Sequence, residues 1–208
     1  MSTINVDNIN EYTSAGGVTI DGLLIKDGAL PVGATGLTKI AGSTFSAESS
    51  VSFDNVFSST FRNYKVLIDT QNSANNTEFQ LRFRDGSGDL TGSNYGIKAM
   101  YAVVSSNANN YTSGYNRTAQ SFGVILAGMG ANTPYGFYLD IWGPNLEEKT
   151  PYAGTGSNGN GHLFHSSGAY TVATALTGIT FYQSSGTITG SIQIYGYKLW
   201  VQHTEIDH

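Results

Sequence analysis

The chain of 208 residues contains no cysteine, which excludes disulfides and thiolate metal sites. Charged residues make up only 12% of the sequence, and Lys and Arg form no run that could follow a phosphate backbone. With 10 basic and 15 acidic residues the net charge is −5, so we expect no nucleic-acid partner. No apolar run approaches the roughly 20 residues that span a bilayer, and the polar N-terminus lacks the features of a signal peptide. We therefore expect neither membrane insertion nor an export signal.

Proline is also scarce, with 4 residues, whereas glycine is abundant, with 26. This composition is typical of many short strands joined by tight turns. Hydrophobic residues make up 39% of the chain, enough for a packed core, and no segment has a convincing amphipathic helical pattern. We predict an all-β fold, an antiparallel β-sandwich of jelly-roll type, with a closed barrel as the alternative. The expected strands are Val51–Phe53, Tyr64–Thr70, Glu78–Arg84, Tyr95–Val104, Phe122–Ala127, Tyr135–Trp142, His162–Tyr170, Gly178–Gln183 and Ser191–Val201.

Two of these strands indicate how their faces are used. In Glu78–Arg84, the apolar residues Phe79, Leu81 and Phe83 alternate with polar ones, which predicts a strand that is buried on one face and wet on the other. In Ser191–Val201, neither set of alternate residues is purely polar, so we expect both faces to be covered. A strand near a subunit contact has this pattern.

The first 28 residues form a segment that cannot fold alone. Apolar residues mostly alternate with polar ones, which is strand period, and Gly-Gly and Asp-Gly pairs mark turns. A thin ribbon with one apolar face buries too little surface to offset the entropy of ordering it, so it must lie on a larger body or on copies of itself. The residues expected to mediate this assembly are Ile4, Val6, Ile9, Val18, Ile20, Leu23 and Ile25.

Residues 29–50 are small, Gly-rich and weakly patterned, which predicts a connector with one short strand around Leu37–Ile40. We place the domain boundary near Ser43. The expected division is residues 1–42 as an extended attachment or trimerisation segment with its linker, and residues 43–208 as the β-sandwich domain.

Residues 3–28 read TINVDNINEYTSAGGVTIDGLLIKDG, and residues 36–69 contain Ser-Val-x-Phe, Val-Phe-Ser and Asn-Tyr-Lys. The first stretch resembles the N-terminal segment shared by fibre and structural proteins of tailed bacteriophages, especially those of marine and cyanobacterial hosts. The second resembles the start of the globular domain in the same virion proteins. The resemblance covers about the first 70 residues, and it rests on motifs with a structural role.

The resemblance implies a homotrimeric appendage on the virion, assembled in the host cytoplasm and docked on another tail or capsid protein through its N-terminal segment. It transfers no catalytic residue. A tail fibre or receptor-binding protein that adheres to a host-surface glycan is the first expectation. A head fibre or capsid decoration protein that stabilises the shell is the second, and a depolymerising tailspike is the third and least favoured.

A loop expected over Ser105–Arg117 has the composition of a binding surface. It is rich in Tyr, Ser, Asn and Gly, as antibody paratopes are. Sugar rings stack on aromatic faces, and amides hydrogen-bond sugar hydroxyls. The alternative is a surface hairpin whose tyrosines pack on the domain or on a neighbouring subunit. The candidate ligand-binding residues are Asn109, Asn110, Tyr111, Tyr115, Asn116 and Arg117.

Two further segments predict turns or loops without a ligand. Tyr152–His165 crowds Gly and Asn, which predicts a flexible tip, and it lacks the Lys-Ser/Thr and the helix of a phosphate loop. Asp85, Ser87 and Asp89 place oxygen atoms at alternate positions as a calcium loop does. Because Gly96 stands where an EF-hand has its closing Glu, we expect a hairpin turn there.

No catalytic constellation, metal site or cofactor is expected. His162 and His165 are three positions apart and would face opposite sides of a strand, so only copies around a threefold axis would bring them together on a metal. Asp140 lies in an expected strand and Glu147 and Glu148 lie in a loop, which does not form the carboxylate pair of a glycosidase. We therefore expect a protein that is not an enzyme.

Deletion of Met1–Gly28 tests this division of the chain. We expect the truncated protein to lose attachment to the virion and to keep a folded sandwich, because the segment supplies a contact to a partner and no part of the core. Recovery with purified particles measures the first effect, and thermal melting by circular dichroism measures the second. A truncated chain that unfolds would show that the segment belongs to the core.

Overall fold

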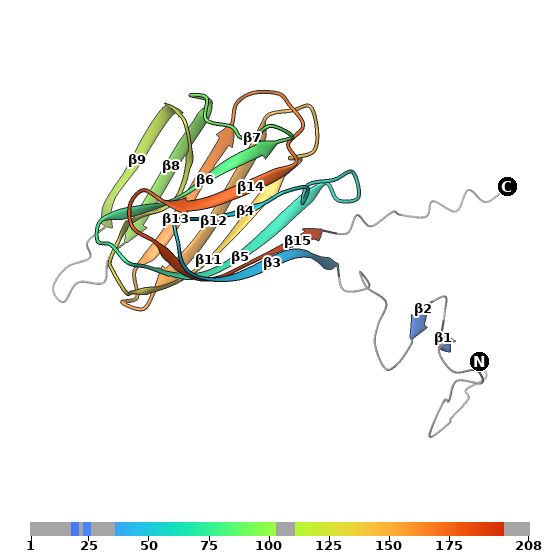
Figure 1. Ribbon diagram of the computed structural model, residues 1–208, viewed down its shortest axis with the longest axis horizontal. Coiled ribbons are helices and arrows are strands. Elements are labelled where there is room, and N and C mark those ends of the chain that lie inside the picture. The colour runs from blue at the N-terminus through green and yellow to red at the C-terminus, as the bar shows by residue number, and fades with distance from the viewer. Residues whose placement is uncertain (1–17, 21–22, 26–35, 103–110, 198–208) are drawn as a thin grey trace, which may run out of the picture.

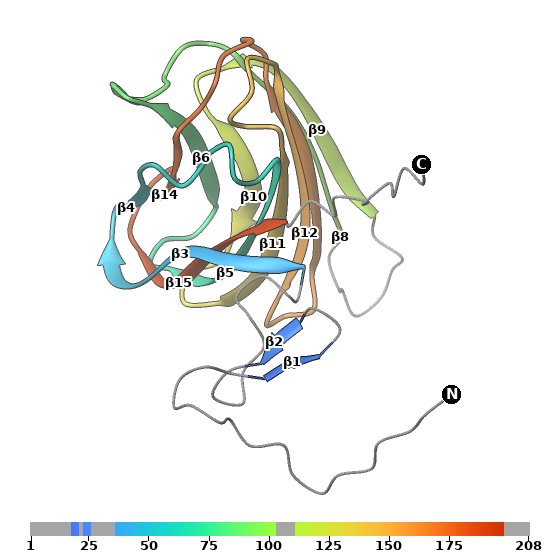
Figure 2. The same cartoon turned by 90° about the vertical axis from the view of Figure 1, so that its right-hand side faces the viewer.

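The computed structural model describes the parts of the chain that lie at residues 18–20, 23–25, 36–102 and 111–197 (Figure 1). The described residues contain no helix, and their strands pair antiparallel. Sheets of eight and five strands pack face to face around a shared core, which confirms the predicted β-sandwich (Figure 2).

The larger sheet has the order β3-β15-β5-β11-β12-β13-β8-β9, and it curves around the smaller one with β3 and β9 as its edges (Figure 2). Its strands are β3 (Leu37–Glu48), β15 (Ile188–Tyr197), β5 (Asn63–Asn72), β11 (Pro134–Trp142), β12 (Thr150–Asn158), β13 (Leu163–Tyr170), β8 (Tyr95–Ala102) and β9 (Tyr111–Gln120). The smaller sheet has the order β10-β6-β14-β4, with β7 paired to β6. Its strands are β10 (Gly123–Met129), β6 (Thr77–Asp85), β14 (Gly178–Gln183), β4 (Ser50–Phe53) and β7 (Gly88–Asp89).

Each of the nine strands predicted in the domain overlaps an observed one. The short strand expected around Leu37–Ile40 is the start of β3, which is 12 residues long. The boundary expected near Ser43 therefore falls inside a strand. Leu37 pairs with Tyr197 at the end of β15, so the described body begins at Leu37.

A third sheet pairs β1 (Val18–Ile20) with β2 (Leu23–Ile25) in the N-terminal segment. Val18 lies opposite Ile25, and Ile20 lies opposite Leu23, so four of the predicted assembly residues belong to one hairpin. The other three lie outside the described residues: Ile4, Val6 and Ile9.

The core between the sheets is centred on Phe83 of β6. Its ring stacks on Tyr95 of β8, with the ring centroids 6.2 Å apart. It also makes edge contacts with Tyr152 of β12 and Tyr170 of β13, at 6.1 and 6.3 Å. Because these partners come from three strands of the larger sheet, one side chain of the smaller sheet holds a broad part of the sandwich together.

Tyr95 adds a polar link between the two sheets. Its hydroxyl accepts a hydrogen bond from the Phe83 backbone N–H at 2.9 Å and donates one to the Leu90 carbonyl at 3.0 Å. The side chain is fully buried, and this burial raises the pKa of Tyr95 well above its ordinary value. The hydroxyl therefore acts as a neutral donor and acceptor at any physiological pH.

The second face of β6 is more covered than its alternation predicts. Phe79, Leu81 and Phe83 are buried, as expected, but Gln80 on the opposite face is only 4% exposed. The Gln80 amide donates a hydrogen bond to the Glu78 carboxylate at 2.9 Å. Polar side chains on this face cover one another, which the alternation of residue types does not reveal.

β12 corrects the prediction of a flexible tip at Tyr152–His165. The first part of this segment is an inner strand of the larger sheet, between β11 and β13. Gly154 faces the core, and a Cβ at this position would overlap the Tyr138 carbonyl oxygen and the ring of Phe137. Close packing under an aromatic ring is thus the reason for glycine here, whereas composition alone indicates a mobile loop.

Substitution of Gly154 by alanine tests this packing. We expect Gly154→Ala to lower the free energy of unfolding by about 2 kcal/mol, because the new Cβ forces the backbone or the Phe137 ring to shift. Gly136→Ala is the matched control: Gly136 lies on the neighbouring strand β11, and a Cβ there would meet no atom within 4 Å. Denaturant titration of both variants measures the difference, and equal stabilities would contradict the packing role.

Candidate binding face

The side of the larger sheet that faces away from the smaller sheet, which we call the outer face, carries most of the exposed large apolar residues. In the described part of the chain there are six such residues, and five of them lie on this face. Each is between 41% and 55% exposed: Leu67, Met100, Tyr138, Trp142 and Leu163. Exposed apolar residues that gather on one face mark an interaction surface more often than scattered ones do.

Strand register aligns several of these residues in one row across the outer face. Leu67 of β5 lies opposite Tyr138 of β11, which lies opposite Thr155 of β12. Thr155 in turn lies opposite His165 of β13, and His165 opposite Met100 of β8. The row is therefore a continuous band of apolar and polar groups that crosses five adjacent strands.

A hollow of about 610 Å³ lies at one end of the outer face, and we call it the Tyr138 hollow. Its apolar lining includes Leu67, Tyr138 and Leu163, and Gly136 lies between them. Asp69 contributes the one charged side chain of the lining. This hollow thus combines an apolar side with several uncharged polar groups and one acidic group.

A second hollow, of about 420 Å³, lies further along the same strands, and we call it the Trp142 hollow. Trp142 and Pro151 form its exposed apolar side. Small residues of the inner strands lie between this side and the polar residues of β8 and β9. The described residues that line the hollow are Gly96, Ile97, Lys98, Asn116, Arg117, Thr118, Trp142, Pro151, Tyr152, Ala153, Ser167, Gly168 and Ala169.

Both hollows depend on an outward glycine. Gly136 lines the Tyr138 hollow and Gly96 lines the Trp142 hollow. A Cβ at either position would meet no atom within 4 Å, so the space above each glycine is open. A larger residue at either position would fill its hollow without displacing the core.

A polar cluster separates the two hollows on β5, β11 and β15. Lys65 Nζ lies 2.9 Å from Asp140 Oδ1, and the Tyr197 hydroxyl donates a hydrogen bond to the same oxygen at 2.6 Å. Lys65 Nζ also lies 4.4 Å from the centre of the Tyr138 ring, in a cation–π contact. The cluster fixes the Tyr138 ring from one side.

The charges and hydrogen bonds of this cluster shift the pKa values of Lys65 and Tyr197. Burial acts to lower the pKa of Lys65, but the hydrogen bonds and charge of Asp140 and Tyr197 outweigh it, so the pKa is raised. Burial raises the pKa of Tyr197, and Asp140 raises it further. The cluster is therefore a stable arrangement of one cation, one anion and one neutral phenol near pH 7.

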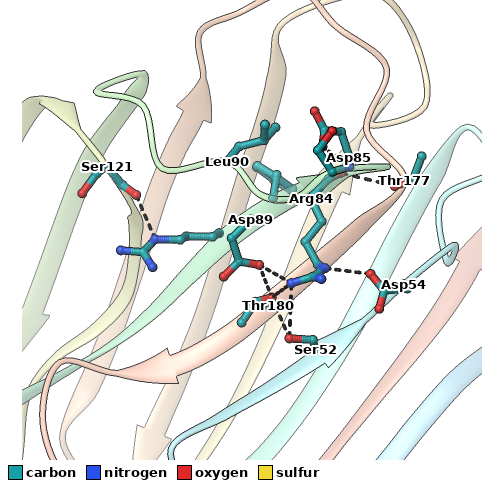
Figure 3. A network of polar contacts seen from close by, with 12 residues as sticks. Ser52, Asp54, Arg84, Asp85, Asp89, Leu90, Ser121, Thr177 and Thr180 are labelled. Atoms are coloured by element: carbon teal, nitrogen blue, oxygen red, sulfur yellow. Dashed lines mark hydrogen bonds and ion pairs between the residues drawn. The ribbon is translucent and has the colours of Figure 1, made fainter.

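The outward face of the smaller sheet carries a different polar network, shown in Figure 3. Arg84 Nε lies 2.7 Å from Asp54 Oδ1, and Arg84 also forms an ion pair with Asp89. The Thr180 hydroxyl donates to Asp89 at 2.6 Å and accepts from Arg84 at 2.9 Å. The single Arg84 cation is shared by the carboxylates of Asp54 and Asp89, so the network stabilises the smaller sheet.

The same network explains the segment that resembled a calcium loop. Asp89 belongs to β7, the short strand that returns from the turn to pair with β6. Its carboxylate is held by Arg84, and Asp85 Oδ1 accepts the backbone N–H of Ser87 at 2.7 Å. Both carboxylates thus serve the turn, in agreement with the expected hairpin.

The candidate ligand residues of the expected loop are distributed differently from the prediction. Tyr111, Tyr115, Asn116 and Arg117 belong to strand β9, the edge of the larger sheet, so the loop expected at these four positions is wrong. Asn116 and Arg117 line the Trp142 hollow. Outside the described residues lie Asn109 and Asn110.

Arg117 is committed to a structural ion pair. Its guanidinium donates to both carboxylate oxygens of Glu78, at 2.7 and 3.1 Å. This bidentate pair joins the edge strand of the larger sheet to β6 of the smaller one. The positive charge of Arg117 is thereby neutralised beside the hollow.

Other chemically active residues do not converge in the described part of the chain. No group of three or more His, Asp or Glu residues there is placed to hold a metal ion. Glu147 and Glu148 are exposed in the segment between β11 and β12, and Asp140 is bound by Lys65 and Tyr197. Within the same described residues, no helix has the length and apolar character needed to cross a membrane.

Sequence reasoning did not identify Trp142 as a candidate binding residue, although a signal was present. In β11 the buried residues Phe137, Leu139 and Ile141 alternate with Tyr138, Asp140 and Trp142. This alternation predicts two aromatic side chains on the outward face of one strand. The alternation does not show that β9 and β12 complete the hollow beside β11, because the sequences of these two strands predict loops.

Neither the protein-family models nor the curated proteins compared with this chain give a match. The fold and the outer face therefore carry the functional argument, together with the resemblance in the N-terminal segment.

A double-mutant cycle on Lys65 and Asp140 tests the polar cluster. We expect Lys65→Met and Asp140→Asn to be coupled by about 1 kcal/mol at pH 7, as partly buried ion pairs are. The folded-state pKa of Lys65 is raised above its ordinary value of 10.5, so the coupling is complete below that pH and declines as the pH rises through the raised pKa. Denaturant titration at pH 7 and at pH 11.5 measures both. A coupling that grows with pH would contradict this assignment.

Proposed function

We propose that the chain is a structural appendage of a bacteriophage virion that adheres to a host-surface glycan through the outer face of its sandwich. The observation that carries the proposal is the Trp142 hollow, where an exposed indole stands beside open space and beside amide, hydroxyl and amine donors. Such an arrangement suits a sugar ring, whose apolar face stacks on an aromatic and whose hydroxyls need hydrogen-bond partners. The resemblance of residues 3–28 to phage virion proteins supports the setting.

The proposed assembly is a homotrimer that docks on another tail or capsid protein through residues 1–36. Leu37 and Tyr197 pair at one end of β3 and β15, so the chain enters and leaves the described body at the same corner of the larger sheet. Three copies held together present three outer faces. Weak individual sites then act together, because the second and third contacts form at high effective concentration.

Adhesion without hydrolysis is the proposed mode of action. A glycosidase needs two carboxyl groups roughly 5 to 9.5 Å apart on either side of the sugar bond. Asp140 is the carboxylate nearest in sequence to Trp142, and Lys65 and Tyr197 occupy it. The residues that line the Trp142 hollow include no Asp or Glu.

Capsid decoration is the second candidate function, and the Tyr138 hollow supports it. Leu67 and Leu163 are poor sugar ligands, but exposed Leu, Met and Tyr side chains suit a protein neighbour. In this case the outer face would contact capsid subunits and stabilise the shell. Imaging of particles with labelled protein distinguishes the two settings, since decoration requires label on the head and a tail fibre requires label on the tail.

Filling each hollow in turn tests the proposed function. We expect Gly96→Val to reduce binding of the full-length protein to host cells by about tenfold or more, because the new side chain fills the Trp142 hollow from the side of β8. Gly136→Val is the matched control, as it fills the Tyr138 hollow with the same side chain. Fluorescence-labelled protein on intact host cells provides the measurement.

The outcomes separate the two candidates. Loss of cell binding in Gly96→Val alone supports adhesion at the Trp142 hollow. If Gly136→Val alone loses binding to capsids, and both variants bind cells as the unmodified protein does, adhesion is overturned in favour of decoration.

A further inference from the structure

We infer that the ligand of the Trp142 hollow is an acidic saccharide, one that carries a carboxylate such as that of a uronic acid. This inference rests on the proposed function, since it names the chemical class of glycan that the same site takes. It is argued from the shape of the hollow, from its aromatic side and from the balance of charge around it.

The shape of the hollow suits a small part of an extended polymer. Its volume of about 420 Å³ falls within the range of about 300–1,000 Å³ that is usual for ligand sites. Gly96, Ala153 and Ala169 line it, and Gly96 has open space above it, so a ligand meets backbone and methyl groups there. The apolar face of a sugar ring can therefore approach the sheet closely.

The groups that can stack on a sugar and the groups that can hydrogen-bond to it lie on opposite sides of the hollow. Trp142 on β11 and Pro151 on β12 offer apolar surface, and Trp142 is 41% exposed. Asn116 and Thr118 on β9 and Ser167 on β13 offer amide and hydroxyl groups. A sugar ring stacked on the indole would thus turn its hydroxyls toward the polar strands.

The charge around the hollow is positive and comes from Lys98. Lys98 and Arg117 are the two charged residues of the lining, and the Glu78 carboxylate neutralises Arg117. Lys98 is exposed, and in the described part of the chain it forms no ion pair. An ammonium group without a counter-ion, beside a sugar-sized hollow, is complementary to a carboxylate on the ligand.

The remaining charges nearby do not alter this balance. Asp140 is held by Lys65 and Tyr197. The exposed Glu147 and Glu148 lie in the segment after β11 and do not line the hollow. The local positive charge is notable because the whole chain has a net charge of −5.

A saccharide fits these groups better than a nucleic acid does. A phosphate backbone is recognised by several Lys and Arg residues along a track, and its affinity depends steeply on salt. Among the described residues, the hollow offers one cation without an ion-pair partner and one exposed indole. That combination matches a sugar ring with a single carboxylate.

Titration with oligogalacturonate and with a neutral malto-oligosaccharide of the same length tests the inference on the full-length protein. We expect oligogalacturonate to bind about fivefold or more tightly than the neutral sugar, and Lys98→Gln to remove that preference. Trp142→Ala should weaken both sugars, since each stacks on the indole. Calorimetry provides the affinities, and a single-stranded oligonucleotide serves as the other anionic probe.

Lys39→Gln is the matched control for charge. Lys39 is an exposed lysine on β3, outside the hollow, so its replacement changes the net charge by the same amount without touching the site. Equal effects of Lys98→Gln and Lys39→Gln, or equal affinities for the two sugars, would overturn the inference. Tighter binding of the oligonucleotide than of oligogalacturonate would overturn it too.

Failure of this inference is distinguishable from failure of the proposed function. If Gly96→Val still reduces host-cell binding, but the protein binds oligogalacturonate no more tightly than the neutral sugar, the glycan is neutral and adhesion stands. If Gly96→Val binds host cells as the unmodified protein does, adhesion at this hollow fails as a whole.

Discussion

The aromatic contact of Phe83 with the larger sheet is the interaction on which the rest of the structure depends. A single ring of β6 touches rings from β8, β12 and β13, and the Tyr95 hydroxyl adds hydrogen bonds to the same strand. Such large rings fit between two sheets only where small residues face them. A Cβ at Gly123 or Gly168 would overlap the Tyr152 hydroxyl. The aromatic core thus accounts for part of the high glycine content.

The same alternation that builds the core determines the outer face. Along β11, each buried residue is followed by one that points away from the core, so Phe137 and Ile141 are adjacent to Tyr138 and Trp142. A glycine that faces the core makes room for an aromatic ring, whereas a glycine that faces outward, such as Gly96, leaves a hollow on the surface. The outward residues of the proposed site, such as Trp142 and Lys98, lie outside the core, so they can change while the core stays the same.

Strand alternation was sufficient to predict the fold class and nine strands, because apolar residues such as Phe79, Leu81 and Phe83 recur with period two. It failed for β9 and β12, where small and polar residues dominate, and in β12 packing against a neighbouring ring decides the conformation. Gly154 illustrates the reason, since its role depends on Phe137 of another strand. For the candidate site, Asn116 was found from composition, whereas Trp142 and Lys98 require the order of strands in the sheet.

In the proposed function, the N-terminal segment attaches the protein and the sandwich binds the ligand. The segment carries the resemblance to virion proteins, and the outer face offers the chemistry for a ligand. The core takes part in neither attachment nor ligand binding. It provides a rigid support, as is usual when binding residues lie on strands rather than on loops.

A crystal structure of the full chain grown with oligogalacturonate is the most direct test of the outer face as a glycan site. We expect saccharide density stacked on the indole of Trp142, with its carboxylate within hydrogen-bond distance of Lys98 Nζ. Saccharide density confined to the Tyr138 hollow, or to residues away from the outer face, would contradict the proposed site.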